Sequence, residues 1–462
     1  NVYRQDPRIV YAIIEHATQG GVYRSDNRGE SWTKMSDTNP RPSYYSKIHI
    51  DPNNDQRIWV LGARMFYSED GGKTFRTNLV EKIHGDFHAL WINPANSNHM
   101  LAGSDGGIHL SYDRGRSWDF ANTVTLAQFY EVGVDMRKPY YVYGGLQDNG
   151  TWGGPSRTLF TQGITNEDWF RVGGGDGFYA VVDPSDHNIV YLESQDGNVQ
   201  RLDQRAFERR NIRPEAPDGQ KYRFNWNSPI LISPHDPKRI YYGGNRLFGS
   251  RDRGETWDTV SPDLPSNAER DQLTIFGKRA KEMLSRNDGV VHFGAITTIA
   301  ESPLKAGILW VGTDDGNLQV SRDGGKTWDN VTEHVPGVPK GTYVSRVEAS
   351  RQGEGAAYAA FDGHRADDYK AYLFRTDDFG KTWKSISGNI PNGGAVSVVR
   401  EHPKNASLLF AGTEYALWAT WNGGGQWRRI KSKLPTVPVD DILIHPRDND
   451  LILGTHGRGV WI

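Results

Sequence analysis

Hydrophobic and polar residues alternate along short segments of this chain, and turns rich in Gly, Pro, Asp and Asn separate these segments. An alternating segment often ends in a proline-containing turn, as in IDPNN (50–54), INPAN (92–96) and ISPHD (232–236). A second apolar segment follows, then a Gly-rich turn, a short third segment and a fourth. Because period-2 alternation between regular turns predicts β-strands, we expect an all-β chain built from repeats of about four strands.

An octapeptide recurs near the end of each third segment, with Asp or Asn at its third position, Gly at its fifth and usually an aromatic residue at its eighth. The acidic or amide side chain can accept backbone N–H groups, the glycine supplies an unusual backbone angle, and the aromatic ring begins the next strand. We therefore interpret the octapeptide as a structural corner, because no copy has the ligand pattern of a calcium loop. Its copies are SDNRGESW (25–32), SEDGGKTF (68–75), SYDRGRSW (111–118), SRDRGETW (250–257), SRDGGKTW (321–328), TDDFGKTW (376–383) and TWNGGGQW (420–427).

This octapeptide resembles the Asp-box of the BNR β-propellers, a group that includes sialidases, sortilin-type domains and two-propeller xyloglucanases. The chain is also similar to long secreted bacterial proteins described as glycosyl hydrolase-like or sortilin-like. That similarity rests on the runs YYVYGGLQDNGTW, WFRVGGGDGFYAVVDP, FNWNSPILISPHDP and ILGTHGRGVWI. The resemblance implies a β-propeller whose Asp-boxes lie between the third and fourth strands of each blade, away from the ligand-binding face.

The strand pattern predicts about ten repeats, of which the first lacks its opening strand. Two arrangements are open. In the first, residues 126–462 form a seven-bladed propeller, and residues 1–125 provide three blades of an incomplete N-terminal propeller whose remaining part is missing from this sequence. In the second, all repeats form a single ten-bladed ring. We favour the first because the chain starts within a repeat.

Composition narrows the possible partners and locations. Lys and Arg number 54 against 56 Asp and Glu, so the net charge is −2 and a nucleic-acid partner is not expected. No apolar run approaches the roughly 20 residues of a membrane helix, so we expect no membrane insertion. The chain contains no cysteine and no cofactor motif. We expect a secreted, periplasmic or cell-surface protein whose partner is a polysaccharide or a protein segment, with the missing N-terminal part of the same protein as a further partner.

The ligand should bind at the channel mouth of the propeller, where turns after second strands and links into the next blade come together. We expect the Asp-box turns and the proline-containing turns to lie on different faces. Asp148 and Asp176 are the leading catalytic candidates, because each stands in a Gly-rich segment at which the repeat pattern fails. Asp105 and Asp315 are further candidates, although an Asp in a tight turn usually serves the turn. Residues expected to bind the ligand are Tyr44, Tyr45, Trp169, Arg171, Trp226, Tyr343 and Arg346.

His84, Asp86 and His88 form an H-x-D-x-H sequence, and in an extended chain their side chains point to one face. A metal could bind there, but polar contacts among these residues explain the pattern equally well, so we predict no metal site. The sequence contains no P-loop, HExxH or GxSxG motif.

Two functions fit these patterns. The first is a propeller that binds a glycan or protein ligand at the channel mouth. The second is an inverting glycoside hydrolase of the xyloglucanase type, in which a pair of Asp residues act as general acid and general base. The sequence leaves open whether the chain is an enzyme; if it is one, we expect a glycoside hydrolase.

Overall fold

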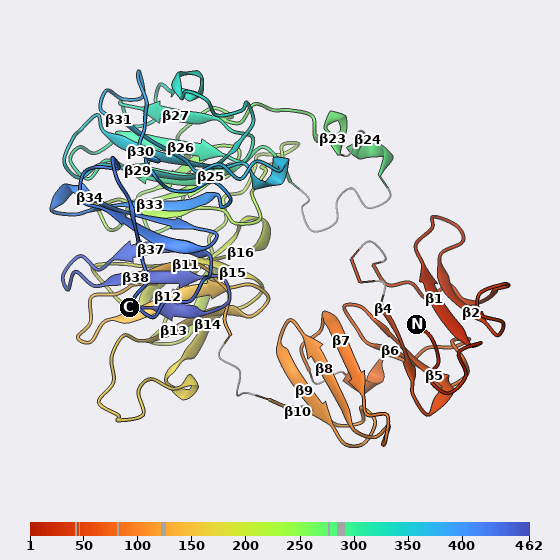
Figure 1. The fold of residues 1–462 in the computed structure, drawn as a ribbon. Helices are drawn as coiled ribbons and strands as arrows, with labels where there is room; N and C mark the ends of the chain where they lie inside the picture. The colour runs from red at the N-terminus through yellow and green to blue at the C-terminus, as the bar shows by residue number, and fades with distance from the viewer. Residues whose placement is uncertain (42–43, 46, 81–82, 122–125, 276–277, 284–291) are drawn as a thin grey trace. The chain divides into compact units, whose positions relative to one another are not determined.

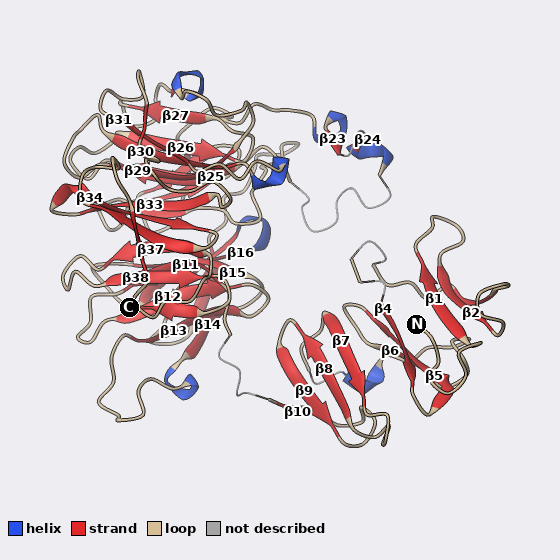
Figure 2. Ribbon diagram, viewed as in Figure 1, coloured by secondary structure: helices blue, strands red, loops and turns tan. Residues whose placement is uncertain are grey.

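The computed structural model describes residues 1–462 except 42–43, 46, 81–82, 122–125, 276–277 and 284–291. Its described part is almost entirely strands and loops, as Figure 2 shows. The chain separates into two compact units: residues 1–124 with 282–286 form unit 1, and residues 125–281 with 287–462 form unit 2. No helix in the described ranges is long and apolar enough to cross a membrane.

Unit 1 contains three antiparallel sheets within its described residues. The first is β1-β2-β3, the second β4-β5-β6, and the third β10-β9-β8-β7. The strands are β1 (Val10–Ile14), β2 (Gly21–Ser25), β3 (Thr33–Ser36), β4 (Lys47–Asp51), β5 (Asn54–Leu61), β6 (Phe66–Ser68), β7 (Phe87–Ile92), β8 (Met100–Ser104), β9 (Gly107–Ser111) and β10 (Asp119–Phe120), with the 3₁₀ turn η1 (Asn78–Val80).

Unit 2 contains seven sheets that follow one another along the chain, counted over its described residues, and we number them blades 1 to 7. Blades 1 to 3 are β11 (Phe129–Val134), β12 (Tyr141–Leu146), β13 (Gly150–Pro155) and β14 (Phe170–Gly173); β15 (Gly177–Val182), β16 (Ile189–Ser194), β17 (Asn198–Asp203) and β18 (Glu208–Asn211); β19 (Ile230–Ile232), β20 (Ile240–Gly243), β21 (Leu247–Ser250) and β22 (Asp258–Thr259). Blades 4 to 7 are β25 (Ile296–Glu301), β26 (Leu309–Thr313), β27 (Leu318–Ser321) and β28 (Asp329–Asn330); β29 (Tyr343–Ala349), β30 (Ala357–Asp362), β31 (Tyr372–Thr376) and β32 (Lys384–Ser385); β33 (Val396–His402), β34 (Asn405–Thr413), β35 (Ala416–Thr420) and β36 (Arg428–Ile430); β37 (Val439–Ile444), β38 (Leu451–Thr455) and β39 (Gly459–Trp461).

Short elements lie in the turns within the blades and in the links between them. A two-stranded hairpin stands in the insertion between blades 3 and 4. The elements are η2 (Asn166–Asp168), η3 (Gln195–Gly197), η4 (Arg270–Gln272), β23 (Thr274–Ile275), β24 (Lys278–Arg279), η5 (Ala280–Glu282), η6 (Thr332–His334) and η7 (His364–Ala366).

Unit 2 is a closed ring. The first strand of each blade is the innermost, and β37 of blade 7 packs against β11 of blade 1. Hydrogen bonds reinforce this closure: the Val132 amide donates to the Asp441 carboxylate at 3.1 Å, and the Gly457 amide donates to the Ala127 carbonyl at 3.1 Å. The chain is therefore a β-propeller with seven blades in unit 2, and the ten-bladed ring is excluded because blade 7 closes on blade 1.

Each Asp-box forms the same local network. In the copy at 321–328, the Ser321 hydroxyl accepts the Gly325 amide at 2.8 Å, while Asp323 accepts the Thr327 amide at 2.9 Å and its hydroxyl at 2.7 Å. Gly325 has φ +91°, and a Cβ there would lie 2.2 Å from Val260, so only glycine fits. The Asp-box is thus a structural corner.

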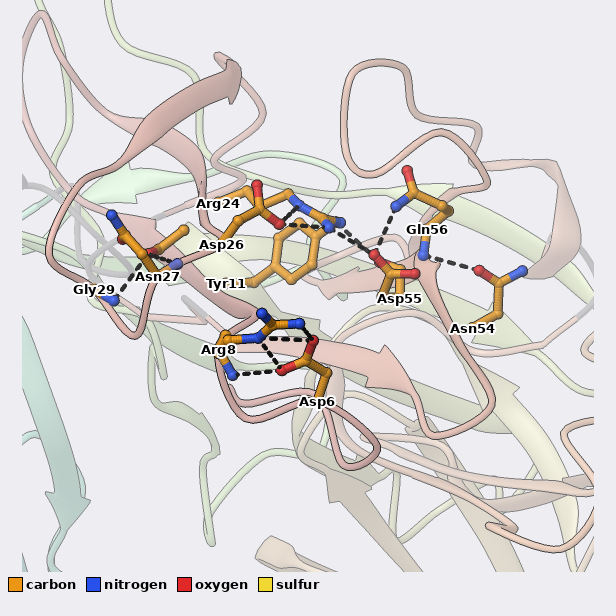
Figure 3. A network of polar contacts seen from close by, with 11 residues as sticks. Asp6, Arg8, Tyr11, Arg24, Asp26, Asn27, Gly29, Asn54, Asp55 and Gln56 are labelled. Carbon is orange, nitrogen blue, oxygen red and sulfur yellow. Dashed lines mark hydrogen bonds and ion pairs between the residues drawn. The ribbon is translucent and has the colours of Figure 1, made fainter.

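The first copy uses Asn27 in place of Asp, as Figure 3 shows. The Ser31 amide donates to Asn27 Oδ1 at 3.0 Å, and Asn27 Nδ2 donates to the Ser31 hydroxyl at 2.9 Å. Nearby, Arg24 forms ion pairs with Asp26 and with Asp55 of the second sheet, each at 2.7 Å. The ion pair between Arg24 and Asp55 therefore joins the first two sheets.

The expectation that Asp-box turns and proline-containing turns lie on different faces is wrong. In an antiparallel four-stranded blade, the first and third turns are on the same side. The contacts agree: the Gly324 amide of an Asp-box donates to the Gly307 carbonyl of the first turn of its own blade at 3.0 Å. Arg253 of another box pairs with Asp183, in the first turn of the preceding blade, at 2.8 Å. The opposite face therefore carries the turns after the second strands, and we call it the mouth.

Most innermost strands of unit 2 contain a β-bulge near the mouth. In β25, β29, β33 and β37 one residue of the innermost strand has no partner on the second strand. In β11 and β15 two residues of the innermost strand lie opposite one residue of the second strand. A bulge bends a strand and re-aims a side chain. In two bulges the extra residue connects neighbouring blades, because Thr297 donates to the Val344 carbonyl and Ser345 to the Val396 carbonyl, both at 2.7 Å.

The centre of the ring is divided by buried ion pairs. Arg346 of blade 5 donates to Glu131 of blade 1 at 2.9 Å and to Asp441 of blade 7 at 3.3 Å. Arg400 of blade 6 adds a contact to Asp441 at 2.9 Å. These charged side chains and aliphatic residues of the innermost strands together line a pocket of about 380 Å³ at the centre of the ring.

Candidate functional site

The mouth of unit 2 carries a ring of polar residues at one repeat position. Each stands at the end of the second strand of its blade or directly after it, and blade 3 has Gly244 there. Each of the remaining six blades supplies one polar residue at this position, so the ring results from the repeat itself. They are Gln147, Gln195, Asp314, Asp362, Glu414 and His456.

Asp148 and Asp176 lie side by side on this ring, between blades 1 and 2. The Asp148 amide donates to the Asp176 carboxyl at 3.0 Å, and the two side chains are also hydrogen-bonded. Gln147 Nε2 donates to Asp148 at 3.1 Å, and the Tyr130 hydroxyl donates to the Gln147 amide oxygen. A continuous hydrogen-bonded series therefore runs from Tyr130 on β11 through Gln147 and Asp148 to Asp176.

The environment of Asp176 favours its protonated form. Only 5% of the residue is exposed, and burial raises its pKa to about 6, with the neighbouring Asp148 charge adding to the effect. Gln195 also hydrogen-bonds to this carboxyl and opposes part of the shift. A carboxyl that holds a proton near pH 6 at a ligand-binding face can act as a general acid.

Aromatic rings pack together beneath the same part of the mouth. Tyr130 of blade 1, the fully buried Phe178 of blade 2 and Trp226 of the link into blade 3 have ring centroids 4.6 Å apart for the first pair and 6.3 Å for the second. Trp226 is half-buried, so part of its ring remains accessible. Farther around the ring, Tyr343 is half-buried under the Arg365 guanidinium, 4.3 Å from the ring centre. Aromatic faces beside carboxyl groups suit the apolar C–H surfaces of sugars.

Other predicted residues have different surroundings. Trp169 packs against Phe129 of the innermost strand β11. The exposed Arg171 donates to the Gly173 carbonyl at 2.9 Å and lies beside Gly150 and Gly174, close in the chain to Asp148 and Asp176. Asp315 accepts the Ser266 amide at 2.7 Å and the Thr313 hydroxyl at 2.6 Å, which is a turn-fixing role. Arg346 was expected to bind the ligand at the mouth, but only 6% of the residue is exposed. Its guanidinium instead donates hydrogen bonds to Glu131 and Asp441.

Unit 1 gathers a separate cluster of predicted residues. Tyr45 donates to Asp86, and the His88 ring lies 5.3 Å from Tyr45 and 5.5 Å from Tyr44. His88 Nε2 lies 3.1 Å from the Asp105 carboxylate. His84, Asp86 and His88 are not brought together as a ligand set, and no group of three potential metal ligands occurs in the described part of the chain.

Tyr130, Phe178 and Asp440 stand at the beginnings of innermost strands, and the sequence patterns assign these residues no role. The bulges explain the omission, because an extra residue interrupts the alternation that tells inward from outward positions. The signal that could have found these three residues is their shared position: each is the second residue of an innermost strand, directly after the link from the preceding blade.

Comparison with known proteins agrees with this architecture. A profile described as the BNR-Asp box repeat matches residues 373–386, the third-to-fourth strand corner of blade 5. A probable oligoxyloglucan-reducing end-specific xyloglucanase of Neosartorya fischeri is 26% identical over 272 residues, covering 54% of this chain and 30% of that protein. Its Emericella nidulans counterpart is 25% identical over 225 residues, covering 47% and 24%. A xyloglucanase of Acetivibrio thermocellus is 25% identical over 250 residues, covering 48% and 27%.

These alignments span 24–30% of the length of the relatives. Among solved structures, a Niastella koreensis GH74 enzyme is 15% identical with a TM-score of 0.28, covering 98% of this chain and 81% of that one. A Xanthomonas campestris GH74 xyloglucanase is 14% identical with a TM-score of 0.28, covering 99% and 77%.

Proposed function

We propose, for a BNR-repeat propeller that resembles the two-propeller xyloglucanases, that this chain is a glycoside hydrolase acting on a neutral glycan of the xyloglucan type. The observation that carries the proposal is the buried carboxyl of Asp176, hydrogen-bonded to Asp148 at the mouth of the ring, where burial raises its pKa. Asp176 is the general acid that protonates the leaving oxygen. Since the substrate would be an extracellular polysaccharide, we place the protein outside the cytoplasm.

We assign different tasks to the two carboxyl groups. An inverting glycosidase needs its acid and base about 6.5–9.5 Å apart, with room for water between them. Asp148 and Asp176 are hydrogen-bonded to each other, so they cannot be that pair. Asp148 instead keeps Asp176 protonated through its negative charge.

The test is hydrolysis of xyloglucan oligosaccharides by the full chain, followed by release of reducing ends. We expect Asp176→Asn to lower kcat by about 10²–10⁴-fold with little change in KM. Activated aryl glycosides, whose leaving group needs no proton, should restore much of the loss. Asp196→Asn is a matched control, because Asp196 stands in the turn after the second strand of blade 2 with φ 59°, a conformation that Asn tolerates.

The pH profile gives an independent check on the same residue. Because the pKa of Asp176 is raised to about 6, kcat should fall as pH rises through that value and the acid loses its proton. Removing the Asp148 charge lowers that pKa, so Asp148→Asn should shift this limb to lower pH. If the alkaline limb of the kcat profile were unchanged in both Asp148→Asn and Asp176→Asn, the assignment of Asp176 as general acid would be contradicted.

A second candidate function is glycan binding without hydrolysis at the same mouth. The contact between Asp148 and Asp176 favours binding over hydrolysis, because these two neighbouring carboxyl groups lie too close together to serve as the acid and base of an inverting glycosidase. Affinity electrophoresis in gels containing xyloglucan separates the two functions. Retardation of wild type without any release of reducing ends would support binding and exclude hydrolysis.

A further inference from the structure

The pocket at the centre of unit 2 is formed by the innermost strands of all seven blades. Its volume of about 380 Å³ is typical of sites that hold small organic molecules. Neither Asp148 nor Asp176 is among the described residues that line it, and the lining includes no member of the polar ring at the mouth. The central pocket is therefore a different site from the one proposed for a glycan.

Aliphatic residues from different blades line this pocket. Val, Ile, Leu and Ala make up half of the lining, and they include Val134, Val182, Ile232, Ile299 and Leu443. Such a lining suits the methylene groups of a ligand, because each methylene group that leaves water strengthens binding about fourfold. An alkyl chain is therefore one part of a ligand that fits.

The charged residues of the lining are unevenly paired. Two arginines hold three carboxyl groups, through the pairs Arg346–Glu131, Arg346–Asp441, Arg400–Asp441 and Arg400–Glu348. The third arginine of the lining, Arg351, is exposed, and it bonds to Glu401 through its backbone amide rather than its guanidinium. Five acidic residues thus share the lining with three arginines, and the fifth acid is Glu301.

Glu301, the last residue of β25, has a carboxyl oxygen that is buried and unpaired. Only 6% of the residue is exposed. Its Oε1 accepts the Gly307 amide at 2.9 Å and the Tyr241 hydroxyl at 3.4 Å, while Oε2 has no hydrogen-bond partner in the described part of the chain. Arg239 donates to the same tyrosine hydroxyl at 2.6 Å, so it contacts Glu301 only indirectly. Since a buried oxygen without a donor costs free energy, a ligand that supplies a donor is favoured here.

The pocket favours a positive ligand over a negative one. Arg346 Nε also lacks a partner among the described residues, but Glu131 and Asp441 already neutralise that guanidinium. An anion at Arg346 would meet a charge that is already paired, whereas a cation at Glu301 meets a carboxyl group with no cation in direct contact. The attraction is therefore stronger at Glu301.

The aliphatic lining favours an organic cation over a metal ion. No group of three potential metal ligands occurs in the described ranges of the chain, and a hard cation such as Ca²⁺ takes about six to eight oxygen ligands. A primary ammonium group instead carries three N–H donors on one charged nitrogen.

We propose that the central pocket of unit 2 binds a short primary alkylammonium ion. Its ammonium group donates to Glu301 Oε2, and its alkyl chain contacts the aliphatic residues of the innermost strands. This site is independent of the hydrolase function, because its lining shares no described residue with the Asp148 and Asp176 pair.

Isothermal titration calorimetry of the full chain with n-butylammonium chloride at pH 7 is the first test. We expect saturable binding, and we expect n-pentylammonium to bind about fourfold more tightly. Sodium pentanoate, which has a similar chain and the opposite charge, should not bind. Equal affinity for pentanoate, an absence of binding by both ammonium ions, or no gain from the longer chain would overturn the proposal.

Glu301→Gln tests the anchor, because it keeps the size of the side chain and removes its charge. We expect the affinity for n-butylammonium to fall at least about tenfold. Glu354→Gln is the matched control, since Glu354 is 47% exposed, pairs with Lys305 at 2.9 Å and lies outside the described lining. Equal affinities of the two variants would contradict the role of Glu301. If Glu301→Gln does not fold, the comparison of chain lengths and charges in wild type still decides.

The acidic mouth is the competing location for an ammonium ion. If Asp176→Asn weakens n-butylammonium binding and Glu301→Gln does not, the ion binds at the mouth and the proposal falls. We expect the reverse, with Asp176→Asn matching wild type in this titration. Hydrolysis of xyloglucan oligosaccharides by Glu301→Gln should match wild type, so failure of either proposal leaves the other standing.

Discussion

The third position of the Asp-box is Asp in some copies and Asn in others. Comparing the two at the residue scale isolates what the negative charge contributes to the corner. Asp323 accepts the amide and hydroxyl of Thr327, and these hydrogen bonds lower its pKa to about 2. Asn27 makes the equivalent contacts to Ser31 with an amide in place of a carboxylate. The shape of the corner therefore needs an acceptor at this position but not a charge.

We expect Asp323→Asn to leave the thermal midpoint at pH 7 nearly unchanged and Asp323→Ala to lower it by a few degrees. The lowered folded pKa means that Asp323 stabilises the protein above about pH 4 and loses this contribution as pH falls through about 2. The Asn variant should lose less stability than wild type over that interval. Calorimetric scans from pH 2 to 7 measure both effects, and a parallel pH dependence of all three proteins would contradict this account.

Bulges set the ring geometry at the scale of single elements, because they connect the innermost strands to one another around the mouth. Thr297 is 6% exposed and donates to the Val344 carbonyl of the next blade at 2.7 Å. This hydrogen bond is independent of the packing between blade faces, where Trp310 of blade 4 meets Trp383 of blade 5 at 6.0 Å.

We expect Thr297→Val to lower the free energy of unfolding by about 1–3 kcal/mol, because a buried carbonyl loses its donor while side-chain volume is preserved. Thr259→Val on the exposed β22 is the control, since it makes the same exchange on a strand that favours β-branched residues. The urea midpoints of the two variants and wild type provide the measurement. Coincident midpoints for Thr297→Val and wild type would show that the bulge contact adds nothing.

The fold was predictable where local chemistry repeats and unpredictable where distant segments meet. Alternation and the Asp-box predicted strands, corners and the starts of innermost strands, because each depends on neighbouring residues. The pairing of Arg346 with Glu131 joins positions 215 residues apart, and no local pattern marks it. Asp148 and Asp315 occupy similar turns, yet only Asp315 meets a hydroxyl from the blade 3–4 insertion, Ser266. The wrong assignment of the turn faces was avoidable, since strand antiparallelism alone decides it.

At the scale of the whole molecule, closure of the ring within unit 2 suggests that its stability is self-contained. We propose that residues 126–462 are an independently folding propeller and that residues 1–125 supply blades of another. The closing contacts include Tyr140 to Asp450 at 3.0 Å and His445 to the Asp135 carbonyl at 3.1 Å. Both join blade 7 to blade 1 without any residue of unit 1.

We expect residues 126–462, expressed alone, to unfold in one cooperative transition within a few degrees of the matching transition of the full chain. Residues 126–438, which lack blade 7, should fail to fold because the core against β11 is uncovered. Differential scanning calorimetry and near-ultraviolet circular dichroism test both fragments. A cooperative transition in the shorter fragment, or none in the longer one, would contradict independent folding of the ring.

The ion pairs at the centre of the ring have a consequence for the proposed hydrolase function. Arg346, Glu131 and Asp441 have side chains only 8%, 10% and 3% exposed, and they join blades 5, 1 and 7 across the axis. Under that proposal, a glycan that enters at the mouth meets these ion pairs at the axis of the ring. We therefore expect substrate and released product to use the same face, so that accumulated product competes directly with substrate.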